Sequence, residues 1–373
     1  MEKIDIHVYL RDLEERIDPA SEEKLYADWL RFADLQWNAP YFKPRRLVKR
    51  PSSLEWPEIM YNDAYESYDG MAYKELIRMN KQLALGGPEL LSYRASYGTV
   101  ILPSLFGADP LLMPYEQNSL PSSKPLADAE GVFRKLLAAG RDAIDVRSGY
   151  AGKPFAAAAH FRDLLKNYPK LAKYSYIYMA DTESPVSIME ALFGSEFYLM
   201  FYDEPELVHD SLALIADVFI RFAEAWHDDF PPVDAGHRNN WGFLHRGHAL
   251  IREDAATNIS GDLYREFIFP HDKRIMEALD GGAIHFCGKG DHLIEHFAEL
   301  PGFYALNMSQ PDWNDMSVIY ENTIHKGATI VGLANYEVNR CLREGLDLMG
   351  RVEAGLGIPA WMADTEEVPD INE

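Results

Sequence analysis

The sequence predicts an α/β fold, a (β/α)8 TIM barrel with an elaborated N-terminal region, and three observations support this prediction. From about residue 86, short apolar runs alternate with helical patterns, which is typical of parallel βα units. The length of 373 residues is one that α/β barrels reach as a single domain. No GxGxxG motif and no P-loop is present, which disfavours the nucleotide-binding form of the alternative, a doubly wound open sheet.

We expect two parts: a helical and looped extension over residues 1–85, and the barrel over residues 86–373. In the extension, residues 21–32 are predicted to be helical because apolar residues recur on one helical face. Four prolines then break the chain into loops. In the barrel, the clearest helix covers residues 205–226, and the candidate strands are 99–103, 175–180, 249–251, 283–287, 303–307 and 328–332.

Charge and cysteine content restrict the classes of partner. The chain has 36 Lys and Arg against 59 Asp and Glu, a net charge of −23, so we expect no nucleic-acid partner and no membrane partner. The one basic run, residues 43–50, is interpreted as a solvated loop, with a local anion site as the alternative. Two cysteines, no signal-peptide pattern and no long apolar stretch fit a cytoplasmic protein that acts on a small molecule.

The most informative motif lies at residues 282–290, where an apolar run leads into His285, Cys287 and then glycines. Side chains at i and i+2 of a strand point to the same face, so an imidazole and a thiol can share one ligand. This pair of donors suits zinc. The alternative is a half-buried strand with a core histidine and a cysteine that acts as a small hydrophobic residue.

Several segments resemble one known family in order along the chain. They are residues 97–107, 181–194, 202–209 and 259–270, the His-x-Cys-Gly segment, and residues 332–335. Together they resemble the uroporphyrinogen decarboxylase (URO-D) superfamily, which includes zinc-dependent methyltransferases that move a methyl group from a methylated corrinoid protein to a thiol. The resemblance covers roughly residues 86 to 373 and implies the barrel.

The resemblance to the methyltransferase branch implies a zinc ion, no nucleotide, and a corrinoid protein as the partner that donates the methyl group. His285 and Cys287 match the first two zinc ligands of that branch, and Leu356 stands at the position of the third, a cysteine. Cys341 does not fit the motif, so its role is not transferred. Zinc lowers the pKa of a bound thiol, so a thiolate attacks the methyl group at neutral pH.

The decarboxylase branch matches less well. Its aspartate falls near Ser104, its tyrosine near Ala191, and its late histidine at Leu356. A cofactor-free decarboxylase that acts on a tetrapyrrole is therefore our second hypothesis. A barrel that binds a ligand or partner without catalysis is the third, motivated by Leu356. The methyl donor, the acceptor and a homodimer stay open, as does whether residues 1–85 form a lid or a base.

The remaining candidate site residues follow expected strand ends, where a barrel carries its active site. His285 and Cys287 are only two ligands, too few to hold zinc tightly. A further metal ligand is therefore sought in Asp254, in Glu253, or in His245 and His248, whose i, i+3 spacing suits one face of a helical turn. Asp254 and Asp181 are the preferred catalytic carboxylates, and His292 is an acid–base candidate or a group that orients His285. Asn307 and Asn335 are candidates for binding a polar substrate, as are His245 and His248. For each residue alone, a structural or surface role is the alternative.

Overall fold

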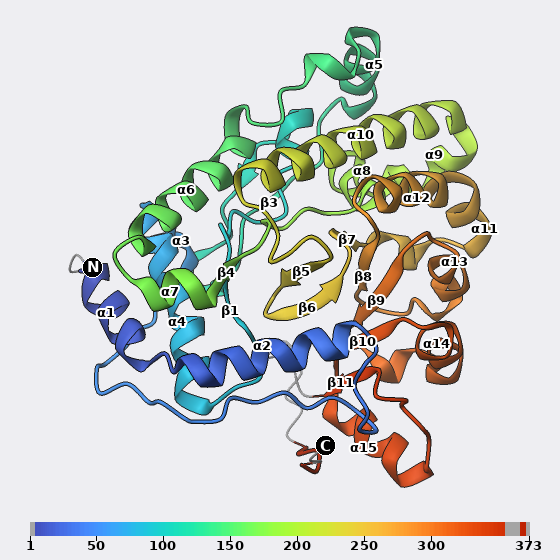
Figure 1. Ribbon diagram of the computed structural model, residues 1–373. Helices are drawn as coiled ribbons and strands as arrows, with labels where there is room; N and C mark the ends of the chain where they lie inside the picture. Colours follow the sequence, from blue (N-terminus) through green and yellow to red (C-terminus); the bar gives the residue numbers. More distant parts are fainter. Residues whose placement is uncertain (1–3, 355–365, 371–373) are drawn as a thin grey trace.

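A computed structural model of the chain describes residues 4–354 and 366–370 and shows a mixed α/β fold built on a parallel sheet (Figure 1). Five strands pair in parallel in the order β11-β10-β9-β8-β7. Nearly every residue in them is buried, which explains why they read as continuous apolar runs. Their bounds are β7 Ala249–Arg252, β8 Gly282–Phe286, β9 Phe303–Met308, β10 Thr329–Leu333 and β11 Val352–Ala354.

A second parallel pair, β1 (Leu91–Tyr93) and β4 (Ser175–Ile177), lies apart from this sheet. Beyond β4, the backbone N–H of Ser184 donates to the carbonyl of Arg252 at 3.4 Å. At the other end, Phe42 pairs in parallel with the free edge of β11. Among the described residues the two sheets do not join into a closed ring, so the eight-stranded barrel stays a prediction.

An antiparallel hairpin, β5 (His237–Asn240) and β6 (Phe243–Arg246), lies between the two parallel sheets (Figure 1). Its two turn residues, Trp241 and Gly242, both have positive φ, 53° and 91°, as a tight two-residue hairpin turn requires. The Gly242 carbonyl accepts a hydrogen bond from the backbone of Leu90, next to β1. On the other side, Trp241 packs against Leu250, Ala283 and Ala305 of β7, β8 and β9.

Helices connect and cover the strands. The longest, α10, begins at Pro205, where proline is favoured in a first helical turn, and packs on α8 and α12. No described helix is long and apolar enough to cross a membrane. The bounds of the helices after β1 are α5 Ala129–Ala139, α6 Lys153–Leu165, α7 Pro169–Tyr174, α8 Pro185–Phe193, α9 Phe197–Asp203, α10 Pro205–Asp229, α11 Gly261–Leu263, α12 Phe269–Ala278, α13 Ile294–Ala298, α14 Met316–Asn322 and α15 Asn335–Glu344.

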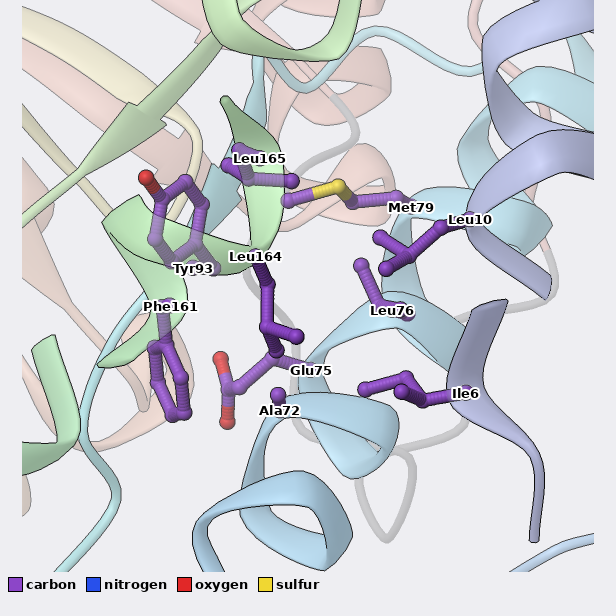
Figure 2. A pocket seen from close by; sticks show the side chains of 10 residues that line it. All are labelled: Ile6, Leu10, Ala72, Glu75, Leu76, Met79, Tyr93, Phe161, Leu164 and Leu165. Atoms are coloured by element: carbon purple, nitrogen blue, oxygen red, sulfur yellow. The ribbon is translucent and has the colours of Figure 1, made fainter. Parts of the chain in front are cut away.

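The N-terminal helices share the cores of the later elements. They are α1 Ile6–Arg16, α2 Pro19–Ala33, α3 Tyr61–Ala64 and α4 Tyr68–Leu85. The apolar face of α2 packs in one cluster with Phe243 and Leu244 of the hairpin and Val331 of β10. Helix α1 packs on α4, where Figure 2 shows a small apolar pocket of about 20 Å³. That space holds about one water molecule, so we interpret it as a packing gap.

The strand predicted at residues 99–103 is wrong, and the solvated loop predicted at residues 43–50 is correct except around Arg46. Residues 99–103 form turns and the start of a short 3₁₀ helix in place of a strand. Gly98 has a φ of 77°, and Pro103 has no N–H to donate to a sheet. In the basic run, Arg46 is buried and paired with Glu22 at 2.6 Å, so this part of the run is not a solvated loop.

Candidate metal site at the ends of β7 and β8

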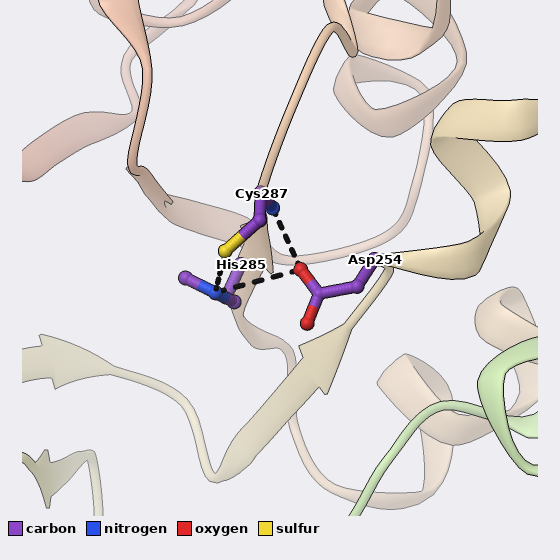
Figure 3. A group of neighbouring side chains, drawn as sticks. All are labelled: Asp254, His285 and Cys287. Carbon is purple, nitrogen blue, oxygen red and sulfur yellow. Dashed lines mark hydrogen bonds and ion pairs between the residues drawn. The ribbon is translucent and has the colours of Figure 1, made fainter. Parts of the chain in front are cut away.

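Three potential metal ligands meet where β7 and β8 end: Asp254, His285 and Cys287 (Figure 3). The Nε2 atom of His285 lies 3.4 Å from the Cys287 Sγ and 3.6 Å from the Asp254 Oδ1. One ligand atom from each residue lies within 4.8 Å of the other two. These are the nitrogen, sulfur and carboxylate donors that zinc accepts.

The sequence places these groups together for local reasons. His285 lies in β8, and Cys287 follows one residue after the strand ends. Gly288, with a φ of 92°, then turns the chain away. Asp254 comes two residues after β7, the strand that pairs with β8. Its Oδ1 accepts a hydrogen bond of 2.6 Å from the backbone N–H of Cys287, which fixes the carboxylate beside the thiol.

Asn307 on β9 sets the orientation of the imidazole. It is the register partner of His285, and its Oδ1 lies 2.6 Å from the His285 Nδ1. The amide nitrogen of Asn307 donates to the carbonyl of Val331 at 2.7 Å, so the oxygen must face the ring. Nδ1 therefore carries the proton, and the lone pair of Nε2 points to Cys287 and Asp254. Burial lowers the pKa of His285, which keeps the ring neutral.

The protonation state of the Cys287 thiol depends on whether a metal ion is bound. Burial, reinforced by the charge of Asp254, raises the pKa of Cys287 to about 11, and its Sγ lies 3.3 Å from the Ser309 Oγ. Without a metal ion the raised pKa keeps the thiol protonated. A bound divalent cation would favour the thiolate instead, because it stabilises the negative charge directly. The donor set therefore fits a metal ion: one neutral imidazole, one thiolate and one carboxylate, which is the usual number of protein ligands in a catalytic zinc site.

A network of buried ion pairs continues from the cluster towards β4. Arg252 lies 2.8 Å from Glu183, 3.5 Å from Asp181 and 3.9 Å from Asp254. Arg94 also pairs with Asp181. Burial raises the pKa of Glu183 to about 7, although Arg252 opposes that shift. The two arginines therefore balance most of the negative charge beside the cluster.

The structure brings four of the predicted site residues into direct contact: Asp254, His285, Cys287 and Asn307. Asp181 joins them only through Arg252. The orienting role suggested for His292 falls to Asn307, because His292 Nε2 is engaged with the carbonyl of Ile259 at 2.9 Å.

Three other candidates lie away from this cluster. His245 is on β6 and His248 in the turn before β7, so the helical turn predicted for them is wrong. The backbone of His248 bonds to Gly281, at the start of β8, the opposite end from Cys287. Asn335 begins α15 and donates to the carbonyl of Glu366. Leu356 lies outside the described residues.

Five neighbours of the site were not predicted: Arg94, Glu183, Trp241, Arg252 and Ser309. Trp241 packs edge-on against the His285 ring at 5.4 Å, and the guanidinium of Arg252 lies 5.8 Å from the Trp241 ring. Arg252 and Glu183 each lie two residues from a predicted carboxylate, Asp254 and Asp181, and this spacing could have indicated them. Trp241 and Arg94 carry no such signal.

Comparison with known proteins supports the fold. A solved structure of a methyltransferase from Methanosarcina mazei is similar over 80% of this chain and 82% of its own, with a TM-score of 0.54 and 17% sequence identity. No family model matches the chain. No curated protein matches its sequence either. The likeness to the solved structure establishes a shared mixed α/β architecture, and membership of the URO-D superfamily stays a prediction.

Proposed function

We propose that this protein is a metal-dependent methyltransferase that transfers a methyl group to a thiol or a similar acceptor. The observation that carries the proposal is the cluster of Asp254, His285 and Cys287, whose ligand atoms lie within 4.8 Å of one another. The structural likeness to a methyltransferase is consistent with it. A carboxylate, Asp254, takes the part that the family resemblance gives to a residue at position 356.

In this proposal Asp254, His285 and Cys287 hold a zinc ion. Bound zinc supplies a Lewis acid that lowers the pKa of a substrate thiol, so the thiolate is available near neutral pH. The other residues prepare the site. Asn307 keeps the imidazole in the tautomer whose Nε2 can bind, and the backbone of Cys287 holds Asp254 in place. Arg252 balances the charge of the carboxylates next to the cluster.

The proposal includes the finer predictions from the sequence. These are a (β/α)8 barrel of the URO-D superfamily over residues 86–373 with an extension over residues 1–85, and a cytoplasmic location. A methylated corrinoid protein is the proposed methyl donor and a small molecule the acceptor. Asp181 and His292 remain candidates for catalysis, and Asn335, His245 and His248 for substrate binding.

Methyl transfer from free methylcobalamin to a panel of small thiols tests this function. The protein is loaded with zinc, and loss of the cobalt–methyl bond is followed by absorbance. We expect thiol-dependent demethylation that Cys287→Ala abolishes and that Cys341→Ala leaves intact, because Cys341 is buried in α15 away from the cluster. Zinc binding without turnover of any thiol would favour a barrel that binds a ligand without catalysis.

A further inference from the structure

A polar cavity of about 240 Å³ lies between α4 and the β1–β4 pair. Four cationic side chains, Lys74, Arg78, Lys81 and Arg94, line it and face two carboxylates. Three of these cations are each paired with a carboxylate: Lys81 with Glu58, Arg78 with Glu89, and Arg94 with Asp181. The cavity therefore offers cationic donors held in place by ion pairs, and such donors suit an anionic group.

Tyr178 supplies the second observation. Its side chain lines the cavity and is only 3% exposed. Within the described part of the chain its buried hydroxyl has no hydrogen-bond partner. A buried polar group without a partner costs free energy, and a ligand oxygen accepting its hydrogen bond removes that cost. Burial raises the pKa of Tyr178, so the hydroxyl stays protonated and can donate.

Two arginines offer further donors in fixed positions. Arg94 uses Nε for Ser96 at 3.0 Å and Nη1 for Asp181. Arg78 uses Nε for Glu89 at 2.6 Å and Nη2 for the carbonyl of Trp241. These bonds hold both guanidinium groups in the wall of the cavity. Guanidinium groups held in this way suit carboxylate or phosphate oxygens.

The cavity is linked to the metal cluster by shared residues. Tyr178 also lines a gap of about 10 Å³, together with Asp181, Trp241 and Arg252. Trp241 packs on the ring of His285, and Arg252 lies 3.9 Å from Asp254. Tyr178 therefore lies between the cavity and a gap whose residues contact or approach two of the candidate metal ligands.

We propose that this cavity binds an anionic group, a carboxylate or a phosphate, carried by the substrate, through Tyr178, Arg94 and Arg78. The assignment of the ligand as the substrate rests on the proposed function. Binding of the anion itself does not, because no metal ligand lines the cavity.

Isothermal titration calorimetry of the full chain tests the proposal, with succinate, inorganic phosphate and neutral succinamide as probes at constant ionic strength. The variant Tyr178→Phe removes only the unpartnered hydroxyl. The matched control is Tyr176→Phe, two residues earlier, in β4, and not part of the cavity lining, where its ring stacks on Tyr26. Hydrogen bonds to charged groups are strong enough that we expect about tenfold weaker anion binding in Tyr178→Phe, and no change in Tyr176→Phe.

Binding of succinate alone would assign a carboxylate, and binding of phosphate alone a phosphoryl group. Absence of binding for both anions, binding of succinamide as tight as that of succinate, or equal affinities in Tyr178→Phe and wild type would overturn the proposal. The same titration on Cys287→Ala separates the two proposals. If Cys287→Ala binds the anion and the wild-type protein contains no zinc, the cavity is an anion site and the metal-dependent function is refuted. If the wild-type protein contains zinc and binds no anion, the metal site stands and the anion site is refuted.

Discussion

The hydrogen bond from His285 to Asn307 gives the sharpest prediction about the candidate metal site. Asn307→Ala removes the acceptor that lies 2.6 Å from the His285 Nδ1. The ring is then free to rotate and to place its proton on Nε2, which blocks that nitrogen as a ligand. Loss of a partner that orients a metal-binding histidine weakens metal affinity by about 10- to 100-fold, which corresponds to about 1.4 to 2.7 kcal/mol.

Two further variants make this prediction specific. Asn307→Asp keeps an oxygen that accepts from Nδ1, so it should retain more zinc affinity than Asn307→Ala, although it loses the donor to the Val331 carbonyl. Asn335→Ala is the matched control, because that asparagine bonds to the carbonyl of Glu366 and does not contact His285.

Zinc affinity is measured by competition with a chromophoric chelator near neutral pH, and the melting temperature of each variant confirms that it is folded. If Asn307→Ala binds zinc as tightly as the wild type and Asn335→Ala, then Nε2 of His285 is not a metal ligand and the reasoning fails.

Three other predictions follow from buried charges and the buried thiol. In metal-free protein the pKa of Cys287 is about 11, so its alkylation by iodoacetamide should accelerate about tenfold per pH unit up to that value; a rate that levels off near pH 8 would contradict this. Burial raises the pKa of Glu353 from 4.5 to about 8, so the folded state holds the Glu353 proton more tightly than the unfolded state does. The resulting stabilisation is complete below the pKa of the unfolded chain and is lost as the pH rises to about 8. Glu353→Gln should therefore gain stability relative to wild type over that range in urea denaturation, and a constant difference would refute the shift. Arg46→Met leaves Glu22 buried and unpaired and should cost about 3–5 kcal/mol of unfolding free energy, whereas Arg45→Met, at a position with a side chain 57% exposed, should cost less than about 1 kcal/mol.

The sequence predicted four of the five strands of the larger sheet and missed β11. Apolar runs at 249–251, 283–287, 303–307 and 328–332 match β7, β8, β9 and β10 to within one or two residues, because strands buried on both faces must be continuously apolar. The run at 99–103 has the same composition but forms turns. The nearest strand, β1, lies upstream at Leu91–Tyr93 and is only three residues long, too short to leave a periodic signal.

At the candidate site, only the contact between residues close together in the sequence could be predicted. The i, i+2 spacing indicated that His285 and Cys287 share a face, and the structure brings their side chains to 3.4 Å. The contact of Asn307 with His285 depends on the register between β8 and β9, which no local pattern records. Likewise Arg94 and Asp181 are 87 residues apart in the chain, so their pairing follows from the fold alone.

The most direct test of the central claim is the zinc content of tag-free protein purified from zinc-supplemented cells. Cys287→Ala removes one of the three proposed ligands, and Cys341→Ala removes the other cysteine as the matched control. We expect near-stoichiometric zinc in the wild type and in Cys341→Ala, and loss of zinc in Cys287→Ala. Zinc-free wild-type protein, or equal zinc in both variants, would contradict a metal site at Asp254, His285 and Cys287.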